Sequence, residues 1–252
     1  MLRLELPLSS PAENLAADEA LLDECEAGRA DEMLLFWEPR EPFVVVGYAN
    51  HVATEVNVAA CDARGVPIFR RCSGGGTVVQ LPGGLNYSLI LRITETGPTR
   101  NISSANQFIM EKNRAAIEKE VRNQKPEVRI AVRGHTDLAR VTHHASRITE
   151  TKFAGNAQRR RKQFLLFHGT LLLDCDLNLI SQLLLMPSKE PAYRANRSHA
   201  EFVTNLNLPA EKVKAALVAD WHAIEPMKNP PLAEIKRLAA EKYAAREWNF
   251  KF

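Results

Sequence analysis

The sequence predicts one α+β domain over residues 1–252, with a mixed or antiparallel β-sheet core and flanking helices. Helix-like and strand-like segments alternate along the chain without the repeated β-α-β regularity of a barrel. The 252 residues, of which 45% are hydrophobic, are enough to build a substantial apolar core. No internal repeat or break in composition marks a linker, so a single domain is the simplest organisation.

The first half of the chain predicts two helices and several short strands. Leu15, Leu21 and Leu22 form an apolar stripe at helical spacing, and Gly28 follows it as a stop signal. Asn57 is a suitable N-cap for the second helix. The segments expected here are a helix over 12–28, a pair of strands over 34–37 and 43–46, a helix over 58–64, and strands over 66–69 and 85–91.

The second half predicts a long helix, further strands and a helical end. Apolar residues recur at helical spacing from Ser103 to Arg122, behind a serine-rich start that is suited to capping. Asp176 is able to cap a helix that runs to Leu185. The remaining segments expected are strands over 128–134 and 164–174, an irregular polar stretch over 188–206, and helices over 209–221 and 232–248.

Composition excludes several classes of protein. The formal net charge is +3, which is too small to indicate a nucleic-acid partner. The N-terminal residues include several acidic side chains and no apolar stretch of signal-peptide length. No segment approaches the roughly 20 apolar residues of a membrane helix. We therefore expect a cytoplasmic protein with no nucleic-acid and no membrane partner.

The segment "RRCSGGGTVVQ" is the first candidate binding site. Its three consecutive glycines, residues 74–76, let the backbone approach a ligand, and their N–H groups can form a concavity for an anion. Arg70 and Arg71 add donors for a carboxylate or phosphate. The alternative is a glycine-rich turn flanked by surface arginines. The segment is neither a P-loop, which ends in Lys-Ser/Thr, nor a dinucleotide fingerprint, because a β-branched run follows.

The segment "TKFAGNAQRRRKQ" is the second candidate. Lys152 lies near Gly155, and four cationic residues follow at 159–162. One interpretation is a mobile cationic loop that closes over a negatively charged ligand. The other is a solvated hairpin turn with ordinary surface charges.

Taken together, the two segments resemble the lipoate-protein ligase A family. "RRCSGGG" is similar to its Arg-Arg-x-Ser-Gly-Gly-Gly signature. "KFAGNAQR" and "HGTLL" are similar to its Lys-x-x-Gly-x-Ala-x-Arg and His-Gly-Thr-Leu-Leu motifs, and weaker similarity runs through Leu206. The resemblance implies a single catalytic domain over 1–252, with the biotin/lipoate ligase-like fold of a mixed β-sheet core and flanking helices.

The resemblance also implies a reaction. ATP activates lipoate, or octanoate, to an acyl-adenylate, and the acyl group then passes to a lysine of a lipoyl domain. The acceptors implied are proteins of the 2-oxoacid dehydrogenase E2 or glycine-cleavage H-protein type. ATP and Mg²⁺ enter as substrate and activator, and no tightly bound cofactor is expected.

The residue roles follow from the matched motifs. Lys152 matches the family lysine that contacts the acyl carbonyl and the adenylate phosphate, and it is the expected catalytic residue. Asp137 matches an acidic position linked to nucleotide and Mg²⁺, and Val78 and Tyr87 are expected to line an apolar acyl channel. The acyl- and nucleotide-binding residues implied are Arg71, Ser73, Gly74, Gly75, Gly76, Val78, Asp137, Gly155, Ala157, His168 and Gly169. For His168, a buried, hydrogen-bonded structural histidine is an equal alternative.

Two departures from the family pattern leave alternatives open. Gln80 and Leu81 stand where many members have a His-Asp pair. The chain is also expected to lack the C-terminal accessory domain of longer ligases, which leaves two routes of activation open: by this chain alone, or together with a separate accessory-domain protein. Otherwise the protein would be a transferase that starts from a preactivated acyl group, or a non-catalytic lipoyl or nucleotide binder.

The transferase alternative depends on a cysteine. Related octanoyltransferases use a cysteine thioester, but this chain has Ser188 after Pro187, and His135 and Thr136 at the other family position. Cys72 is a possible substitute, because the neighbouring arginines and N–H groups would favour its thiolate. It occupies the variable position of the signature, so we expect it to be a small apolar residue.

Overall fold

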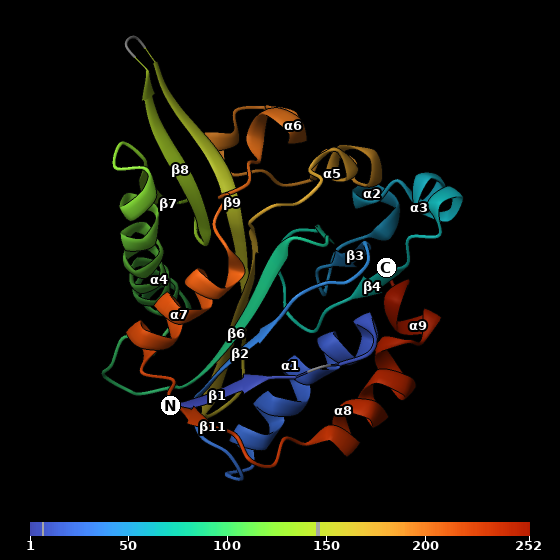
Figure 1. Cartoon of the computed structure of the whole chain (residues 1–252). Coiled ribbons are helices and arrows are strands. Elements are labelled where there is room, and N and C mark those ends of the chain that lie inside the picture. The colour runs from blue at the N-terminus through green and yellow to red at the C-terminus, as the bar shows by residue number, and fades with distance from the viewer. Residues whose placement is uncertain (7, 145–146) are drawn as a thin grey trace.

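An eight-stranded mixed sheet runs through the protein. The structure is a computed structural model and describes residues 1–6, 8–144 and 147–252. The strand order is β11 (Glu225–Pro226), β1 (Leu2–Glu5), β2 (Met33–Trp37), β6 (Gly84–Arg92), β10 (Phe164–Leu172), β9 (Arg147–Arg160), β8 (Asp137–His144) and β7 (Arg129–Arg133). β1 pairs in parallel with β2 and β11, and the other neighbours are antiparallel. The mixed sheet and flanking helices confirm the predicted fold class (Figure 1).

A second, three-stranded sheet carries the glycine segment. Its order is β4 (Ile68–Arg70), β3 (Phe43–Val46) and β5 (Val78–Gln80), with β4 parallel and β5 antiparallel to β3. The glycine segment connects β4 to β5 across the edge of this sheet. The runs at 34–37 and 43–46 are therefore strands as predicted, but they belong to different sheets instead of forming a pair.

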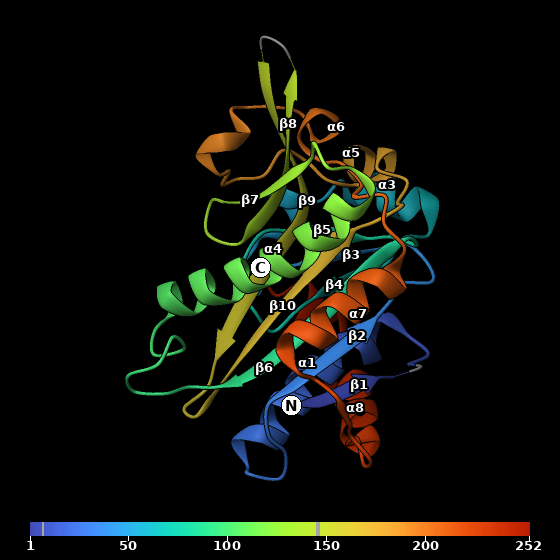
Figure 2. The ribbon, with the colours of Figure 1, turned by 60° about the vertical axis from the view of Figure 1, so that its left-hand side comes forward.

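Helices cover both faces of the large sheet. On one face α4 (Ile102–Gln124) and α7 (Ala210–Trp221) pack over Phe167, Leu165 and their neighbours (Figure 2). On the other face α1 (Pro11–Glu26) and α8 (Leu232–Leu238) pack over Leu35, Leu166 and Ile90. The shorter helices are α2 (Val52–Glu55), α3 (Val58–Arg64), α5 (Asn178–Leu183), α6 (His199–Phe202) and α9 (Arg246–Asn249), with a 3₁₀ turn over Ala192–Arg194 and a π turn over Ala239–Tyr243.

Local sequence explains most helix boundaries. Ser10 caps α1 by accepting a hydrogen bond from the N–H of Glu13, and Pro11 occupies the first turn. Asn57 caps α3 as predicted, through its side-chain oxygen and the N–H of Ala60. The cap of α4 is Asn101, which precedes the serines that were expected to cap it. Among the described residues, no helix is long and apolar enough to cross a membrane.

Residues 137–160 differ most from expectation. Residues 137–144 and 147–160 of this range form the paired strands β8 and β9 in the upper part of Figure 1, and the cationic run at 159–162 belongs to the end of β9 and its turn into β10. Arg159 donates to the carbonyl oxygen of Cys72, and Arg161 pairs with Asp23 at 2.7 Å. The prediction of a mobile cationic loop is therefore wrong, because this run is fixed by strand pairing and by its own ion pairs.

Candidate functional site

Most of the predicted site residues lie on the sheet face that α1 and the small sheet cover. Asp137 pairs with Gly155 across β8 and β9, and Gly155 pairs with Thr170 across β9 and β10. Cross-strand partners project to the same face of a sheet. A β-bulge next to Ala139 inserts Phe153 as an extra residue, so that Lys152 and Gly155 project to one face although they are three positions apart.

Lys152 is held by an ion pair. Its Nζ lies 2.7 Å from Oδ1 of Asp137, and the two side chains are 27% and 13% exposed. The hydroxyl of Tyr193 donates to the other carboxylate oxygen, Oδ2 of Asp137, at 2.9 Å. Burial, reinforced by the nearby Asp137 carboxylate, raises the pKa of Tyr193, so this phenol stays protonated and remains a donor. Tyr193 was not predicted, because no spacing in the sequence links the irregular stretch to Asp137.

Gly155 makes room for the lysine. A Cβ at this position would lie 2.8 Å from Nζ and 2.9 Å from Cε of Lys152. Any larger residue would therefore displace the ammonium group from its position beside Asp137. This steric requirement explains why the motif has a glycine three residues after the lysine.

The glycine loop is folded around Arg71. The guanidinium donates to the hydroxyl of Ser73 at 3.0 Å, and to the carbonyl oxygens of Gly74 and Gly76, each at 2.7 Å. Burial lowers the pKa of Arg71 to about 10, which still leaves it charged at neutral pH. These hydrogen bonds direct the loop carbonyls toward Arg71, and its contact with a ligand remains a prediction.

The backbone of the loop is tightly placed but open on one side. Gly75 has φ +86°, and a Cβ there would lie 3.0 Å from Arg71 and 3.4 Å from Cβ of Ala157. Ala157 on β9 thus supports the loop from below. Among the described residues, no acceptor takes the backbone N–H of Gly74, Gly75 or Gly76, and all three glycines are exposed. Such free N–H groups form a suitable concavity for an anion.

A buried hydrogen-bonded chain closes the other end of the site. Nε2 of His168 lies 2.5 Å from Oγ of Ser73, and Nδ1 of His168 lies 2.6 Å from Oδ2 of Asp18 on α1. Ser88 donates to Oδ1 of Asp18 at 2.5 Å. His168 pairs with Ala157, which is five residues from Lys152, so the site extends roughly 15 Å along β9. Asp18 and Ser88 were not predicted, although an acidic residue within the apolar α1 stripe is a usable signal.

Gly169 and Tyr87 lie on the opposite face of the sheet. A Cβ on Gly169 would come within 1.8 Å of Oδ1 of Asn156, which explains the glycine by packing. The hydroxyl of Tyr87 donates to that same oxygen at 2.6 Å and accepts from Asn113 of α4 at 2.8 Å. The expectation that Tyr87 lines the site beside Val78 is therefore wrong.

Three residues near the glycine loop are buried, and their surroundings within the protein explain their state. Arg70 is fully buried, and its donors are taken by backbone carbonyls, so the expected grip of Arg70 on an anion is wrong. Burial raises the pKa of the Cys72 thiol to about 11, which disfavours the thiolate. Gln80 exchanges two amide hydrogen bonds with Asn86 and donates to Thr170, so a neutral network stands where the family has a charged pair.

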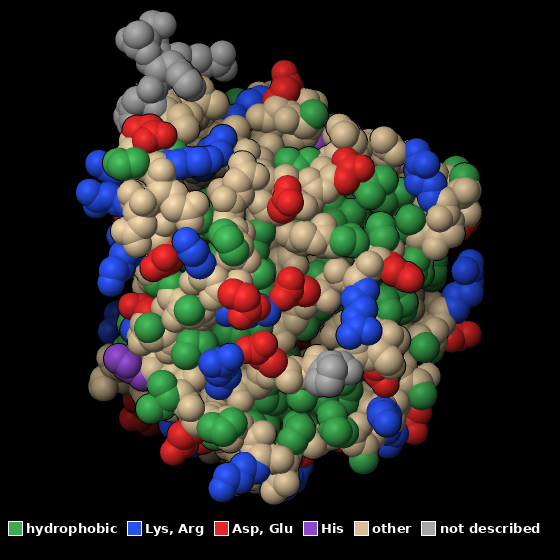
Figure 3. Space-filling view, in the orientation of Figure 1, with side chains coloured by type: hydrophobic (Ala, Val, Ile, Leu, Met, Phe, Trp, Pro, Cys, Tyr) green, Lys and Arg blue, Asp and Glu red, His purple; other side chains and the backbone are tan. Residues whose placement is uncertain are grey.

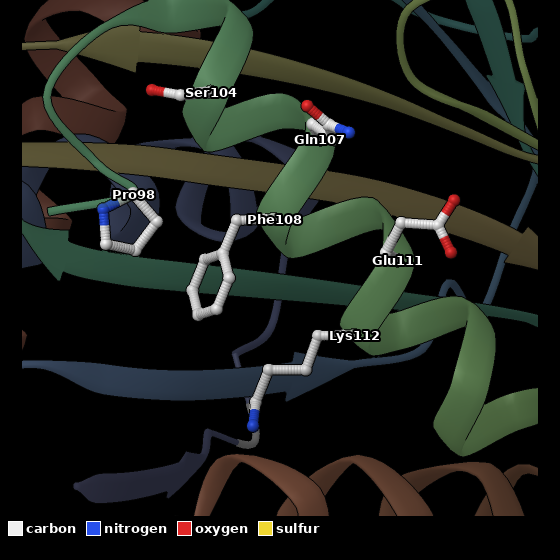
Figure 4. A pocket seen from close by; sticks show the side chains of 6 residues that line it. All are labelled: Pro98, Ser104, Gln107, Phe108, Glu111 and Lys112. Atoms are coloured by element: carbon white, nitrogen blue, oxygen red, sulfur yellow. The ribbon is translucent and has the colours of Figure 1, made fainter.

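The surface outside this site offers weaker candidates. A hollow of about 590 Å³ lies on α4 (Figure 4), and it contains no predicted site residue. Its lining is Pro98, Ser104, Gln107, Phe108, Glu111 and Lys112. On the face seen in Figure 3, basic and acidic side chains are interspersed. Among the described residues, no group of three or more His, Cys, Asp or Glu side chains could hold a metal ion.

Comparison with known proteins identifies the family of this chain. Residues 10–221 match the family model described as the lipoyl protein ligase A/B catalytic domain. A protein named as a lipoate-protein ligase A in Mycoplasma genitalium is 27% identical over 258 residues, which cover 97% of this chain and 70% of the relative. The octanoyltransferase LipM of Geobacillus kaustophilus is 28% identical over 265 residues, which cover 96% of this chain and 94% of the relative.

A solved structure has the same fold. The bi-partite lipoate protein ligase of Thermoplasma acidophilum, described together with its E2 lipoyl domain, superposes with a TM-score of 0.75. It is 22% identical, and the match covers 99% of this chain and 94% of that one. At this identity the likeness establishes the fold alone.

Proposed function

This chain belongs to the family of lipoyl protein ligase A/B catalytic domains, and on that premise we propose that it is an ATP-dependent lipoate-protein ligase. Its relatives are lipoate-protein ligases and octanoyltransferases, which are enzymes of acyl transfer in protein lipoylation. The proposed reaction activates lipoate, or octanoate, with ATP and transfers the acyl group to a lysine of a lipoyl domain. Residues 1–252 would act as one catalytic domain.

The observation that carries the proposal is that Lys152 and the open glycine loop lie on the same face of the sheet. The Lys152 ammonium and the free N–H groups of residues 74–76 are two donor sets for anionic oxygen. Joining a carboxylate to a triphosphate brings two anions together, so the site must reduce their repulsion. An ammonium group and free backbone N–H groups are donors suited to this task.

The first step forms the acyl-adenylate. A carboxylate oxygen of lipoate attacks the α-phosphorus of ATP, the bond to the β-phosphate breaks, and pyrophosphate leaves. The loop N–H groups would hold phosphate oxygens, while Lys152 would stabilise the charge that develops on the α-phosphate. Mg²⁺ would enter with ATP, since Mg²⁺ is commonly bound by substrate phosphates with one or two carboxylates. Asp137 is the carboxylate available for it and also orients Lys152.

The second step transfers the acyl group. The acceptor lysine amine attacks the acyl carbonyl carbon, the bond to the phosphate oxygen breaks, AMP leaves, and the amine gives up a proton as the amide forms. Lys152 would polarise the acyl carbonyl, so that this one residue serves both steps. The acyl tail would extend along β9 past Ala157 toward Val78.

A second function is an octanoyltransferase that starts from a preactivated thioester. The LipM relative supports it, because 94% of its length is covered. The side chains present favour the ligase. All four cysteines, Cys25, Cys61, Cys72 and Cys175, are buried, and Ser188 donates its hydroxyl to Glu55 where an octanoyltransferase has its cysteine. A non-catalytic lipoyl or nucleotide binder is the third candidate.

The partners proposed are lipoyl-domain proteins of the E2 or H-protein type. The Thermoplasma acidophilum structure, described with its E2 lipoyl domain, supports this class. A separate accessory-domain protein would be required only if this chain alone fails to form the adenylate.

The test supplies two acyl donors to one acceptor. In one reaction the purified chain is incubated with a lipoyl domain, lipoate and MgATP, without carrier protein. In the other it is incubated with the lipoyl domain and octanoyl-carrier protein, without ATP. Mass spectrometry of the acceptor then measures acylation. We expect modification with lipoate and ATP. Modification by octanoyl-carrier protein alone would overturn the ligase in favour of the transferase, and ligand binding without either modification would favour the binder.

A further inference from the structure

Arg70 is a charged group that the proposed mechanism does not use. It is fully buried, and all its donors go to backbone carbonyl oxygens rather than to a carboxylate. Those oxygens belong to Gly47, Tyr48, Asn50, Trp248 and Asn249, at 2.8 to 3.1 Å. Each nitrogen of this buried guanidinium donates to at least one carbonyl oxygen, so Arg70 links the chain segments that supply those oxygens.

One of these segments is the C-terminal end of the chain. Residues 246–252 lie beyond the region 10–221 that the family model covers. Besides the two carbonyl contacts, Oδ1 of Asn249 accepts from the backbone N–H of Arg70 at 2.9 Å. Nε1 of Trp248 donates to the carbonyl of Arg70 at 2.8 Å. The ammonium of Lys251 lies 3.5 Å from the ring centre of Tyr48, which ties the same segment to the loop at 47–50.

The loop at 47–50 in turn supports the glycine loop. The N–H of Tyr48 donates to the carbonyl of Ser73 at 2.8 Å, and Nδ2 of Asn50 donates to the hydroxyl of Thr77 at 3.3 Å. Gly47 is so close that a Cβ there would lie 2.1 Å from the carbonyl oxygen of Gly75. The two loops are therefore in backbone contact at Ser73 and Gly75, and a side-chain hydrogen bond joins them at Thr77.

We propose that Arg70 is a positioning residue, and that residues 246–252 set the glycine loop through it. The C-terminal segment fixes Arg70, Arg70 fixes the carbonyls of residues 47–50, and these residues fix Ser73, Gly75 and Thr77. The orientation of the free N–H groups at 74–76 therefore depends on a segment that contributes no group to the ligand itself. The inference rests on the proposed function, because it assigns these N–H groups to phosphate.

The test uses side-chain changes in α9 of the full-length chain. Asn249→Ala removes the acceptor for the N–H of Arg70, and Trp248→Phe removes the donor to its carbonyl while the ring near Lys251 remains. Glu247→Ala is the matched control, because Glu247 is exposed on the same helix. Lipoate-dependent exchange of pyrophosphate into ATP gives kcat and the KM for ATP, and thermal unfolding is measured alongside.

We expect Asn249→Ala and Trp248→Phe to raise the KM for ATP about five- to tenfold, because a small displacement of a binding group strongly weakens its contact. The KM for the acceptor domain should be unchanged, and Glu247→Ala should match the wild type. A merely structural segment would lower the unfolding temperature or the active fraction and leave the KM for ATP unaltered, which would overturn the proposal. Arg70→Lys, which keeps the charge but not the planar fork, should raise the KM further.

The wild type separates this proposal from the proposed function. If the wild type exchanges no pyrophosphate but transfers octanoate from carrier protein, the ligase is refuted. The same variants are then compared for the KM of octanoyl-carrier protein. If neither activity is found, titration calorimetry with ATP gives the dissociation constant instead. In either case, an unchanged constant in Asn249→Ala and Trp248→Phe refutes the positioning role.

Discussion

The glycine loop and the lysine of β9 lie on the same face of the sheet, but the loop is fixed by many more hydrogen bonds than the lysine. The loop is fixed from two sides by buried guanidinium groups, Arg70 behind it and Arg71 within it, and both bond to backbone carbonyls. The ammonium of Lys152 has one ion pair, to Asp137, and its side chain is 27% exposed. The loop is thus fixed by contacts within the protein, whereas the lysine can exchange Asp137 for a ligand oxygen.

This difference assigns separate tasks to the two regions. Preorganised N–H groups stabilise charge without reorganisation, so the loop suits the phosphates, whose position must not change between steps. A flexible ammonium group suits the reacting centre, where the acyl carbonyl and the α-phosphate are contacted in turn. We therefore expect substitutions at the lysine to affect rates and substitutions that disturb the loop to affect binding.

The largest expected effect comes from removing the lysine. Lys152→Ala should lower acyl transfer to the acceptor by about 10²- to 10³-fold, because removal of one donor at a developing charge costs about that much. The fold should be retained, since the lost ion pair is partly exposed and such pairs contribute little stability. Mass spectrometry of the acceptor and thermal unfolding measure the two quantities.

Thr151→Ala is the matched control for this experiment. It changes the neighbouring residue of β9, pairs with Arg140, and forms no side-chain hydrogen bond among the described residues. Wild-type acyl transfer by Lys152→Ala would refute the catalytic role of Lys152. The lysine and the loop would then differ only in how they are packed.

A smaller effect is expected from Gly155→Ala, which moves the lysine without removing it. The new methyl group would overlap Nζ and Cε of Lys152, and these are the far end of a flexible side chain, so the fold can adapt. Displacement of the ammonium by about 1 Å should lower kcat about 10- to 100-fold and leave the KM for ATP near its wild-type value. Steady-state kinetics give both constants. An increase in KM without a change in kcat would mean that Gly155 serves binding, as the loop does.

The two regions also differ in how far the sequence predicts them. The loop and the lysine were found because three glycines in succession and a Lys-x-x-Gly motif are local patterns with steric reasons. The local pattern does not separate Arg70 from Arg71, because two adjacent arginines look alike until their partners are known, and only the family resemblance singled out Arg71. Arg70 depends on Asn249, which is 179 positions away.

The same limit applies to the strands and to the polar partners. The apolar runs predicted β2, β6 and β10 well, but β9 mixes charged, polar and small residues and has no apolar run that would mark it as a strand, although it lies between β10 and β8. Tyr193 and Asp18 complete the polar contacts of Asp137 and His168. They come from elements that only the tertiary fold brings to the sheet, so no spacing in the sequence links them to Asp137 and His168, although Asp18 stands out as an acidic residue in the apolar stripe of α1.

The smallest effect is expected from Cys72→Ala, which tests the loop side of the comparison. Arg159 bonds to the carbonyl oxygen of Cys72 rather than to its sulfur, and the thiol is 5% exposed with its pKa raised by burial to about 11. Removing the sulfur should leave the loop backbone in place and acyl transfer within about twofold of the wild type, because the thiolate that a nucleophile requires is disfavoured at neutral pH. The small cavity should cost about 1 kcal/mol and lower the unfolding temperature by about 2–4 °C. Acceptor acylation and a thermal melt measure these quantities, and loss of transfer with an unchanged melt would instead identify Cys72 as a nucleophile.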